Sequence, residues 1–191
     1  IFIAVGTHVT TSQDGINWTA RYFSGVNNPR GIAYGNGLFV VVGETGKILT
    51  SPDGINWTTR ASGITNTLNG IVFGNGFFVI VGDGNTSGGT ILTSPNGINW
   101  TPRSPGSINY LGKVAYGNGI FVIVGNNNIM SSPDGINWTS RSFGTGSGFQ
   151  DVTYGNGRFV ALGSTIIYSQ FPLAPTTNVI RTVAGDALKL S

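Results

Sequence analysis

Short runs of apolar residues alternate with Gly- and Asn-rich breaks along the whole chain. In a representative unit, the apolar segment Ile32–Tyr34 is followed by Gly35–Gly37, and Leu38–Val42 is apolar on both of its alternating faces. A run of that kind is typical of a strand that is covered on both sides. The Asn-Gly pair between the two segments favours a tight hairpin, because both residues tolerate positive φ. The pattern therefore predicts two paired antiparallel strands.

Two more strands are predicted to complete the unit. The turn-forming residues Glu44–Gly46 lead into Lys47–Thr50, and Ser51–Gly54 lead into Ile55–Arg60. Gly, Asp, Pro and Ser are the residues that tight turns favour. The unit is thus predicted to be a four-stranded antiparallel meander.

This unit recurs at a period near 40 residues. The tryptophans that mark it, spaced by 39, 43 and 38 residues, are Trp18, Trp57, Trp100 and Trp138. A second apolar element, which begins with Phe, occurs five times, at Phe2, Phe39, Phe78, Phe121 and Phe159. A meander that cannot bury both faces alone and is repeated around a ring is typical of a β-propeller. We predict an all-β, five-bladed β-propeller of four-stranded antiparallel blades over residues 1–170, with units near 1–21, 31–60, 70–103, 113–141 and 151–170.

The two ends of the chain are expected to complete the ring. The first unit lacks its opening strand, and the last keeps Ile166–Ser169 but loses the Asp-Gly-Ile-Asn-Trp sequence. We expect residues 171–191 to supply the closing strand or strands, a linker to a further domain, or both. Asn178–Arg181 are the candidate fourth strand of blade five, and Thr182–Ala184 the candidate first strand of blade one. A solenoid or an open arc of a larger propeller is the competing interpretation, because an unclosed edge strand invites association.

Composition and charge narrow the range of partners. Charged residues make up only 9% of the 191 residues, against a typical quarter, and the net charge of +3 is dispersed. A nucleic-acid partner is not expected, because no run of basic residues is present. Membrane insertion is not expected either, because the longest apolar runs, such as Phe77–Val81, are far too short to span a bilayer. The chain opens at Ile1 without an initiator Met or a leader, which suggests processing or excision from a longer protein.

The sequence Ser51-Pro52-Asp53-Gly54-Ile55-Asn56-Trp57 resembles the Asp-box, or BNR repeat, of sialidases and related propellers, with one spacer residue fewer. In that family the element is a structural turn between the third and fourth strands of a blade. The resemblance covers four of the five units and implies a structural role for Asp14, Trp18, Asp53, Trp57, Asn96, Trp100, Asp134 and Trp138.

The chemistry of these residues fits the same role. An Asp side chain accepts hydrogen bonds from nearby backbone N–H groups, Gly adopts positive φ, and Trp packs between sheets. Asn96 in the third unit fits as well, because an amide oxygen can still cap a turn but an amide cannot act as a base. An arginine stands three residues after each Trp, at Arg21, Arg60, Arg103 and Arg141. We expect these arginines to pair with turn carbonyls or with the turn acids, and an anion-binding ring is the alternative.

Catalysis is not expected from this chain. Sialidases of the same architecture use arginines, a Tyr nucleophile and catalytic acids. Here three of the seven acids lie in the turns, and the others stand in non-equivalent loops: Glu44, Asp83, Asp151 and Asp186. No spacing suggests the pair of carboxylates that glycosidases need, and His8 is the only histidine. We therefore expect no catalytic residues, no metal site and no cofactor.

Strand alternation separates the loops into two faces. The first and third turns of each unit share one face and are nearly identical between units, whereas the 2–3 loops and the 4–1 connections share the other face and vary. A constant frame with variable tips is typical of a binding surface, although neutral drift on exposed loops explains the same pattern. The candidate ligand-binding residues on this variable face are His8, Arg30, Glu44, Lys47, Asn69, Asp83, Asn85, Lys113, Asn127, Gln150 and Asp151.

Three function classes follow. The leading hypothesis is a non-enzymatic binding or adhesion module, which recognises a glycan or a protein surface as part of an extracellular or virion structural protein. Residues 182–191 resemble junction segments of phage tail and fibre proteins, which implies a virion surface and contacts with neighbouring subunits. The second hypothesis is an assembly factor resembling the photosystem II assembly propellers, which share Asp-box-like repeats. The third is a sialidase-like glycoside hydrolase.

Overall fold

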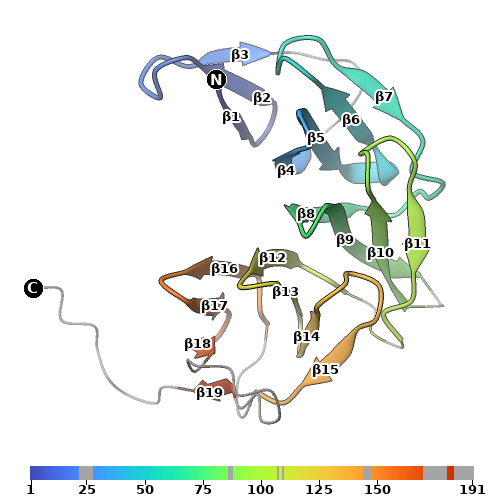
Figure 1. The fold of residues 1–191 in the computed structure, drawn as a ribbon, viewed down its shortest axis with the longest axis vertical. Helices are drawn as coiled ribbons and strands as arrows, with labels where there is room; N and C mark the ends of the chain where they lie inside the picture. Colours follow the sequence, from blue (N-terminus) through green and yellow to red (C-terminus); the bar gives the residue numbers. More distant parts are fainter. Residues whose placement is uncertain are drawn as a thin grey trace, which may run out of the picture.

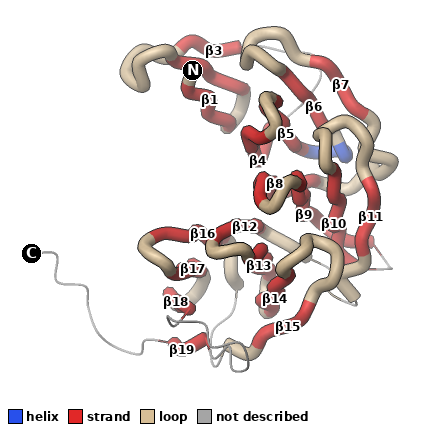
Figure 2. Tube along the Cα trace, viewed as in Figure 1, coloured by secondary structure: helices blue, strands red, loops and turns tan. Residues whose placement is uncertain are grey.

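The computed structural model describes residues 1–21, 28–85, 88–106, 108, 110–143, 148–169 and 180–182. Within these residues the chain is all-β and forms five antiparallel sheets that follow one another around an arc (Figure 1). We call them blades one to five. Strands and loops account for nearly all of the described chain, with one short 3-10 helix, η1 (Glu44–Gly46), between β5 and β6 (Figure 2). No helix in the described part is long and apolar enough to cross a membrane.

Each blade is a meander of consecutive strands. Blade one consists of β1 (Phe2–Val5), β2 (Val9–Ser12) and β3 (Thr19–Arg21). Blade two consists of β4 (Pro29–Gly35), β5 (Leu38–Gly43), β6 (Ile48–Ser51) and β7 (Thr58–Arg60). Blade three consists of β8 (Leu68–Gly74), β9 (Phe77–Asn85), β10 (Gly88–Ser94) and β11 (Thr101–Arg103). Blade four consists of β12 (Lys113–Gly117), β13 (Ile120–Gly125), β14 (Asn128–Ser132) and β15 (Thr139–Arg141). Blade five consists of β16 (Asp151–Gly155), β17 (Arg158–Leu162), β18 (Ile166–Ser169) and β19 (Ile180–Thr182).

The predicted hairpins are present. Gly35 pairs with Leu38, which leaves Asn36 and Gly37 as a two-residue loop. Their φ values are 49° and 74°, the positive values that such a loop requires. The prediction that Asn-Gly closes the first hairpin of a unit is therefore confirmed.

The predicted fourth strand is too long. Ile55, Asn56 and Trp57 precede β7 and belong to the turn, not to the strand. The reason is local, because the N–H groups of Ile55 and Asn56 both donate to the carboxylate of Asp53 and are not available to a neighbouring strand. The structure therefore has a seven-residue turn from Ser to Trp in blades one to four, at 12–18, 51–57, 94–100 and 132–138, which we call the Ser-to-Trp turns.

The hydrophobic core lies between successive blades. Between blades two and three, for example, Val40 and Val42 pack against Phe78 and Ile80, and all four are fully buried. Strands that are apolar on both faces are needed for this arrangement, because each inner blade contacts a neighbour on either side. The innermost strands β4, β8, β12 and β16 line the inside of the arc, with successive strands in contact (Figure 1).

The ends of the arc differ from the predicted closed ring. β19 pairs with β18, so a fourth strand for blade five from the C-terminal segment is confirmed, shifted to Ile180–Thr182. Thr182, expected in blade one, instead pairs with Ile167 in blade five, and residues 183 and 184 lie outside the described residues. Blade one has three strands within the described part, with β1 at its edge. Closure of the ring by residues 171–191 thus stays a prediction.

Candidate functional site

The acids of the Ser-to-Trp turns are fully occupied by their own turns. Asp53 accepts hydrogen bonds from the N–H groups of Ile55 and Asn56, from the Asn56 amide and from the Ser51 hydroxyl, all at 2.8 Å. These donors hold the pKa of the Asp53 carboxyl far below its usual range, the backbone N–H of Asn56 having the largest effect. The equivalent donors of their own turns lower the pKa of the Asp14 and Asp134 carboxyls, with the backbone N–H of Asn17 and of Asn137 having the largest effect. The turn acids are therefore structural.

Asn96 in the third turn retains part of this network. Its oxygen accepts from the N–H groups of Ile98 and Asn99, each at 3.0 Å. The side-chain bond that Asn56 makes to Asp53 has no counterpart here, because the second terminal atom of Asn96 is an amide nitrogen, which is a donor. The predicted tolerance of the turn for Asn is physically accounted for.

The turn tryptophans lie at the edges of the blade interfaces. Trp57, Trp100 and Trp138 are half-buried, and each packs against the apolar cluster shared with the preceding blade. Trp18 in blade one, where the described residues contain no preceding blade, is 46% exposed. Packing between sheets is thus observed for three of the four.

The repeated arginines pair within their own blades. The Arg60 Nε donates to the Thr50 hydroxyl at 2.9 Å, and Arg21, Arg103 and Arg141 make the equivalent bond at 3.1, 2.9 and 2.6 Å. The partners are hydroxyls one strand away, because Arg and Thr stand on paired strands and point to the same side. Among the described residues these hydroxyls are the side-chain partners observed for the four arginines, and pairing with turn acids or turn carbonyls stays a prediction.

The two kinds of repeated turn share one face of the molecule. The Asn36 amide of one hairpin donates to the Pro95 carbonyl in the Ser-to-Trp turn of the next blade at 2.9 Å, and Asn75 donates to Pro133 at 3.3 Å. These bonds connect successive blades. The predicted separation into a constant and a variable face therefore has a structural basis.

On the variable face, side chains from three blades meet near the inside of the arc. In blade two, Arg30 and Glu44 form an ion pair at 2.8 Å, and the Asn28 amide donates to Glu44 at 3.1 Å. These two donors lower the pKa of the Glu44 carboxyl, Arg30 more than Asn28. Arg30 stands near the start of β4, directly after the 4–1 connection that Asn28 ends, and Glu44 opens the 2–3 loop, so the two kinds of variable loop contact each other where they join the strands.

Asn69 connects blades three and four. Its side chain is buried, and its amide nitrogen donates to the Asp83 carboxylate at 2.6 Å and to the Leu111 carbonyl at 3.1 Å. A buried amide with its donors satisfied is held in one orientation. Asp83 is thereby held in place near the end of β9.

Lys113 extends from blade four across two other blades. Its Nζ donates to the Arg30 carbonyl at 2.9 Å and to the Asn69 carbonyl at 2.8 Å. Partial burial lowers the pKa of the Lys113 ammonium, and the negative charge of Asp151 opposes that shift. We call Arg30, Glu44, Asn69, Asp83 and Lys113 the inner polar cluster, and Asp151 opens β16 of blade five.

Close backbone packing makes this reach possible. A Cβ on Gly70 would lie 3.3 Å from the Lys113 Cα, and one on Gly31 would lie 3.3 Å from the Gly70 Cα. The absence of side chains at these two positions lets the innermost strands approach closely. The two glycines and the acceptor carbonyls were not singled out from the sequence, since a backbone acceptor leaves no signal in residue type.

The other candidate residues lie apart from the cluster. Lys47, Asn127 and Gln150 are exposed on their loops, and His8 contacts the Thr7 hydroxyl at 2.9 Å. Asn85 ends β9, and its side chain lies outside the described residues. In the described part of the chain, no group of three or more His, Cys, Asp or Glu side chains could hold a metal ion.

Comparison with known proteins identifies the fold but not a family. No protein-family model matches the chain, and no curated protein matches it. Among solved structures, one of a nidogen–laminin complex superposes with a TM-score of 0.69 at 14% identity, over 92% of this chain and 76% of that one. YCF48 bound to D1 peptide gives 0.66 at 17% identity, over 88% and 61%, and YCF48 from Cyanidioschyzon merolae gives 0.67 at 17%, over 95% and 66%.

These similarities establish a β-propeller fold. The chain spans less than two thirds of the length of the YCF48–peptide chain. At such low identity the likeness concerns the arrangement of the blades.

Proposed function

We propose that this chain is a non-enzymatic propeller module that binds a protein surface through its variable face. The observation that carries the proposal is the inner polar cluster, in which five candidate residues from three blades lie together. The Arg30 and Glu44 side chains are 46% and 31% exposed, so a partner can contact both charges of the pair. Such charged groups on a rigid base favour specific recognition.

Rigidity supports a binding role. Lys113 and Asn69 bond to carbonyls of other blades, so the backbone that carries Arg30 moves little relative to its neighbours. Association then costs less conformational entropy, because the binding residues are already ordered. Two of the similar structures contain a protein or peptide partner, laminin and the D1 peptide, which supports a protein ligand.

The acids of the cluster argue against glycosidase chemistry. Glu44 is paired with Arg30, and Asp83 accepts from Asn69. A retaining or inverting glycosidase needs one carboxyl group with a raised pKa as the acid, whereas the pKa of Glu44 is lowered. Together with the occupied turn acids, this supports a role without catalysis.

A glycan is the second ligand class that the structure supports. A hollow of about 420 Å³ adjoins Glu44 and is lined by Thr45, Lys47, Thr59, Ser62 and Thr65, among others. Hydroxyls and an ammonium can hydrogen-bond to sugar hydroxyls. We also propose that the protein is a propeller of the Asp-box type, because of its repeat sequence. The low charge content supports a place on an extracellular or virion surface, next to other subunits. An assembly factor is the alternative, which the YCF48–D1 peptide structure favours.

Site-directed photo-crosslinking tests the proposal. A benzoyl-phenylalanine at Lys47 or Asn127, on the variable face, is expected to crosslink the partner in the source cells. The same group at Asn36, on the constant face, serves as the matched control and is expected to crosslink at least about tenfold less, because interface contacts are confined to one patch. Equal crosslinking from both faces contradicts the proposal. A parallel glycan array separates the two ligand classes.

A further inference from the structure

The groove between two successive blades is normally filled by the Ser-to-Trp turn of the second blade. In the groove between blades two and three, Trp100 packs against the cluster that contains Val40 and Phe78. In the next groove, Trp138 packs against the cluster that contains Val79 and Phe121. Both indole rings face the Phe of their own blade, with centroids 6.4 and 6.5 Å apart.

The groove between blades four and five has the same walls and no tryptophan from this chain. Val122 occupies the place of Val40 and Val79, and Phe159 the place of Phe78 and Phe121. The registers agree, because Ala161 pairs with Ile167 in blade five as Ile80 pairs with Leu92 and Ile123 with Met130 in blades three and four. After Ser169 the sequence departs from the repeat, and the residue six positions on is Pro175 where the other units have Trp. The Ser169 hydroxyl accepts the Phe159 N–H at 3.0 Å.

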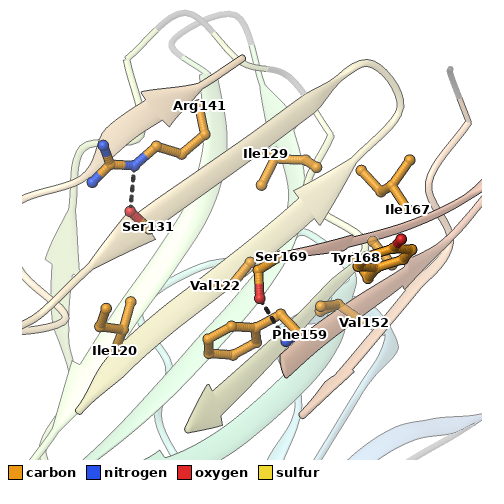
Figure 3. A pocket seen from close by; sticks show the side chains of 11 residues that line it. Ile120, Val122, Ile129, Ser131, Arg141, Val152, Phe159, Ile167, Tyr168 and Ser169 are labelled. Carbon is orange, nitrogen blue, oxygen red and sulfur yellow. Dashed lines mark hydrogen bonds between the residues drawn. The ribbon is translucent and has the colours of Figure 1, made fainter. Parts of the chain in front are cut away.

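A pocket of about 40 Å³ lies at this place (Figure 3). Its apolar lining includes Ile120, Val122, Ile129, Val152, Phe159 and Ile167. Ala161 widens it, since the equivalent residues are the larger Val41, Ile80 and Ile123. Ser131 and Arg141, joined by a hydrogen bond of 2.6 Å, form a polar edge that Figure 3 shows beside the apolar side chains.

We propose that this pocket binds a tryptophan side chain presented by a turn of a protein partner. Three equivalent grooves of the same molecule hold an indole half-buried against the same kinds of residue, so the walls are already shaped for one. The pocket is small because only one edge of the ring enters it, as with the half-buried Trp100 and Trp138. Apolar contact on the Phe159 ring supplies the attraction, and the Ser131–Arg141 edge meets the polar groups of the turn.

This site is separate from the variable face. Ile120 directly follows a hairpin of the constant face. Ser169 ends β18 and Ser131 is the last residue but one of β14, and both strands lead to that face. The constant face is therefore not purely structural at blade five. The inference goes beyond the function proposed above and does not depend on the inner polar cluster.

A peptide with the chain's own turn sequence, residues 51–60 with blocked ends, is the probe. We expect the intact protein to bind it in isothermal titration, and to bind the version with Trp replaced by Ala at least about tenfold more weakly, as for a hot-spot aromatic. Methyl NMR on the unmodified protein is expected to show the largest shifts at Ile120, Val122 and Ile129. Shifts spread over other methyl groups would overturn the assignment of the site.

Two variants locate the binding site. Ala161→Ile restores the residue type of the other blades and narrows the pocket, so it is expected to weaken peptide binding at least about tenfold without lowering the melting temperature. Ile123→Val, at the same position in an occupied groove, is the matched control and should bind the peptide as the unmodified protein does. Unchanged binding by Ala161→Ile would overturn the proposal.

The chain's own connection is the competing occupant. Residues 170–179 link β18 to β19 and lie outside the described residues. If they fill the pocket, the unmodified protein does not bind the peptide and Phe171→Ala does, and that result overturns the proposal. Absence of binding by both proteins overturns it as well.

Discussion

At the residue scale, the acids that recur from unit to unit accept hydrogen bonds from the backbone of their own turns. Both carboxylate oxygens of Asp53 accept hydrogen bonds from donors of its own turn. The Asn96 side-chain oxygen accepts the equivalent backbone hydrogen bonds without a charge. The sequence suggested this role, because the substitution of an amide for an acid is compatible with capping and incompatible with acid–base chemistry. The exposure of the Trp18 side chain could not be read from the sequence, because it depends on whether a preceding blade covers the indole.

Asp53→Asn is predicted to lower stability at pH 7 and to reduce the acid sensitivity of the protein. The pKa of Asp53 is depressed in the folded state, so its contribution is present above the unfolded value and is lost as pH falls through the folded value. The free energies of unfolding of the two proteins in urea are expected to differ at pH 7, and the difference is expected to begin to shrink as the pH falls below about 4. A difference that stays constant down to about pH 2.5 would show that the Asp53 charge does not matter to the fold.

At the element scale, the first strand of each inner blade ends on a glycine that the next blade covers. A methyl group at Gly35, Gly74 or Gly117 would overlap the aromatic ring of Phe73, Tyr116 or Tyr154 of the following blade. In the sequence these glycines are the first residue of each Gly-Asn-Gly hairpin. The positive φ values of the turn explain the Asn and the second Gly, but not the first Gly. The reason for the first glycine is close packing between blades, which local sequence does not reveal.

Gly74→Ala is predicted to destabilise the protein by about 1–3 kcal/mol, the usual cost of overpacking. Gly155→Ala is the matched control, because it occupies the same position in blade five and has nothing within 4 Å of an added Cβ. Urea unfolding is expected to show a clear loss for the first variant and almost none for the second. Equal losses would mean that the backbone, and not the neighbouring ring, requires glycine.

At the scale of the whole molecule, the blades form an arc whose two outer faces carry exposed apolar side chains. Phe2 is 54% exposed on blade one and Ile166 is 50% exposed on blade five, whereas the equivalent Phe78, Phe121 and Ile48 are buried. Blade five departs from the repeat on its outer face. Arg158 stands where the other blades have Leu38, Phe77 and Ile120, and it lies over the Tyr168 ring at 5.4 Å.

Lys113 connects three blades at the inside of the arc. Lys113→Met keeps the aliphatic stem and removes the donors to the Arg30 and Asn69 carbonyls, which is predicted to cost about 1–3 kcal/mol, as for hydrogen bonds to a charged group. Arg30→Met removes only an exposed ion pair and is predicted to cost under about 1 kcal/mol. Chemical unfolding compares the two variants. A larger loss for Arg30→Met would contradict the role of Lys113 as the connection between blades.

The sequence by itself determined the repeat unit, the number of blades, the hairpins and the structural role of the turn acids. These features depend on residues close together in the chain, whose spacing and turn chemistry are readable directly. Only the tertiary structure decided that Lys113 reaches Arg30, 83 residues away, and that Asn69 reaches the Leu111 carbonyl, 42 residues away. It also decided that a pocket lies beside Phe159, at the place where the last repeat lacks its tryptophan. Such contacts depend on how separate blades face each other across the arc, and no local pattern encodes that relation.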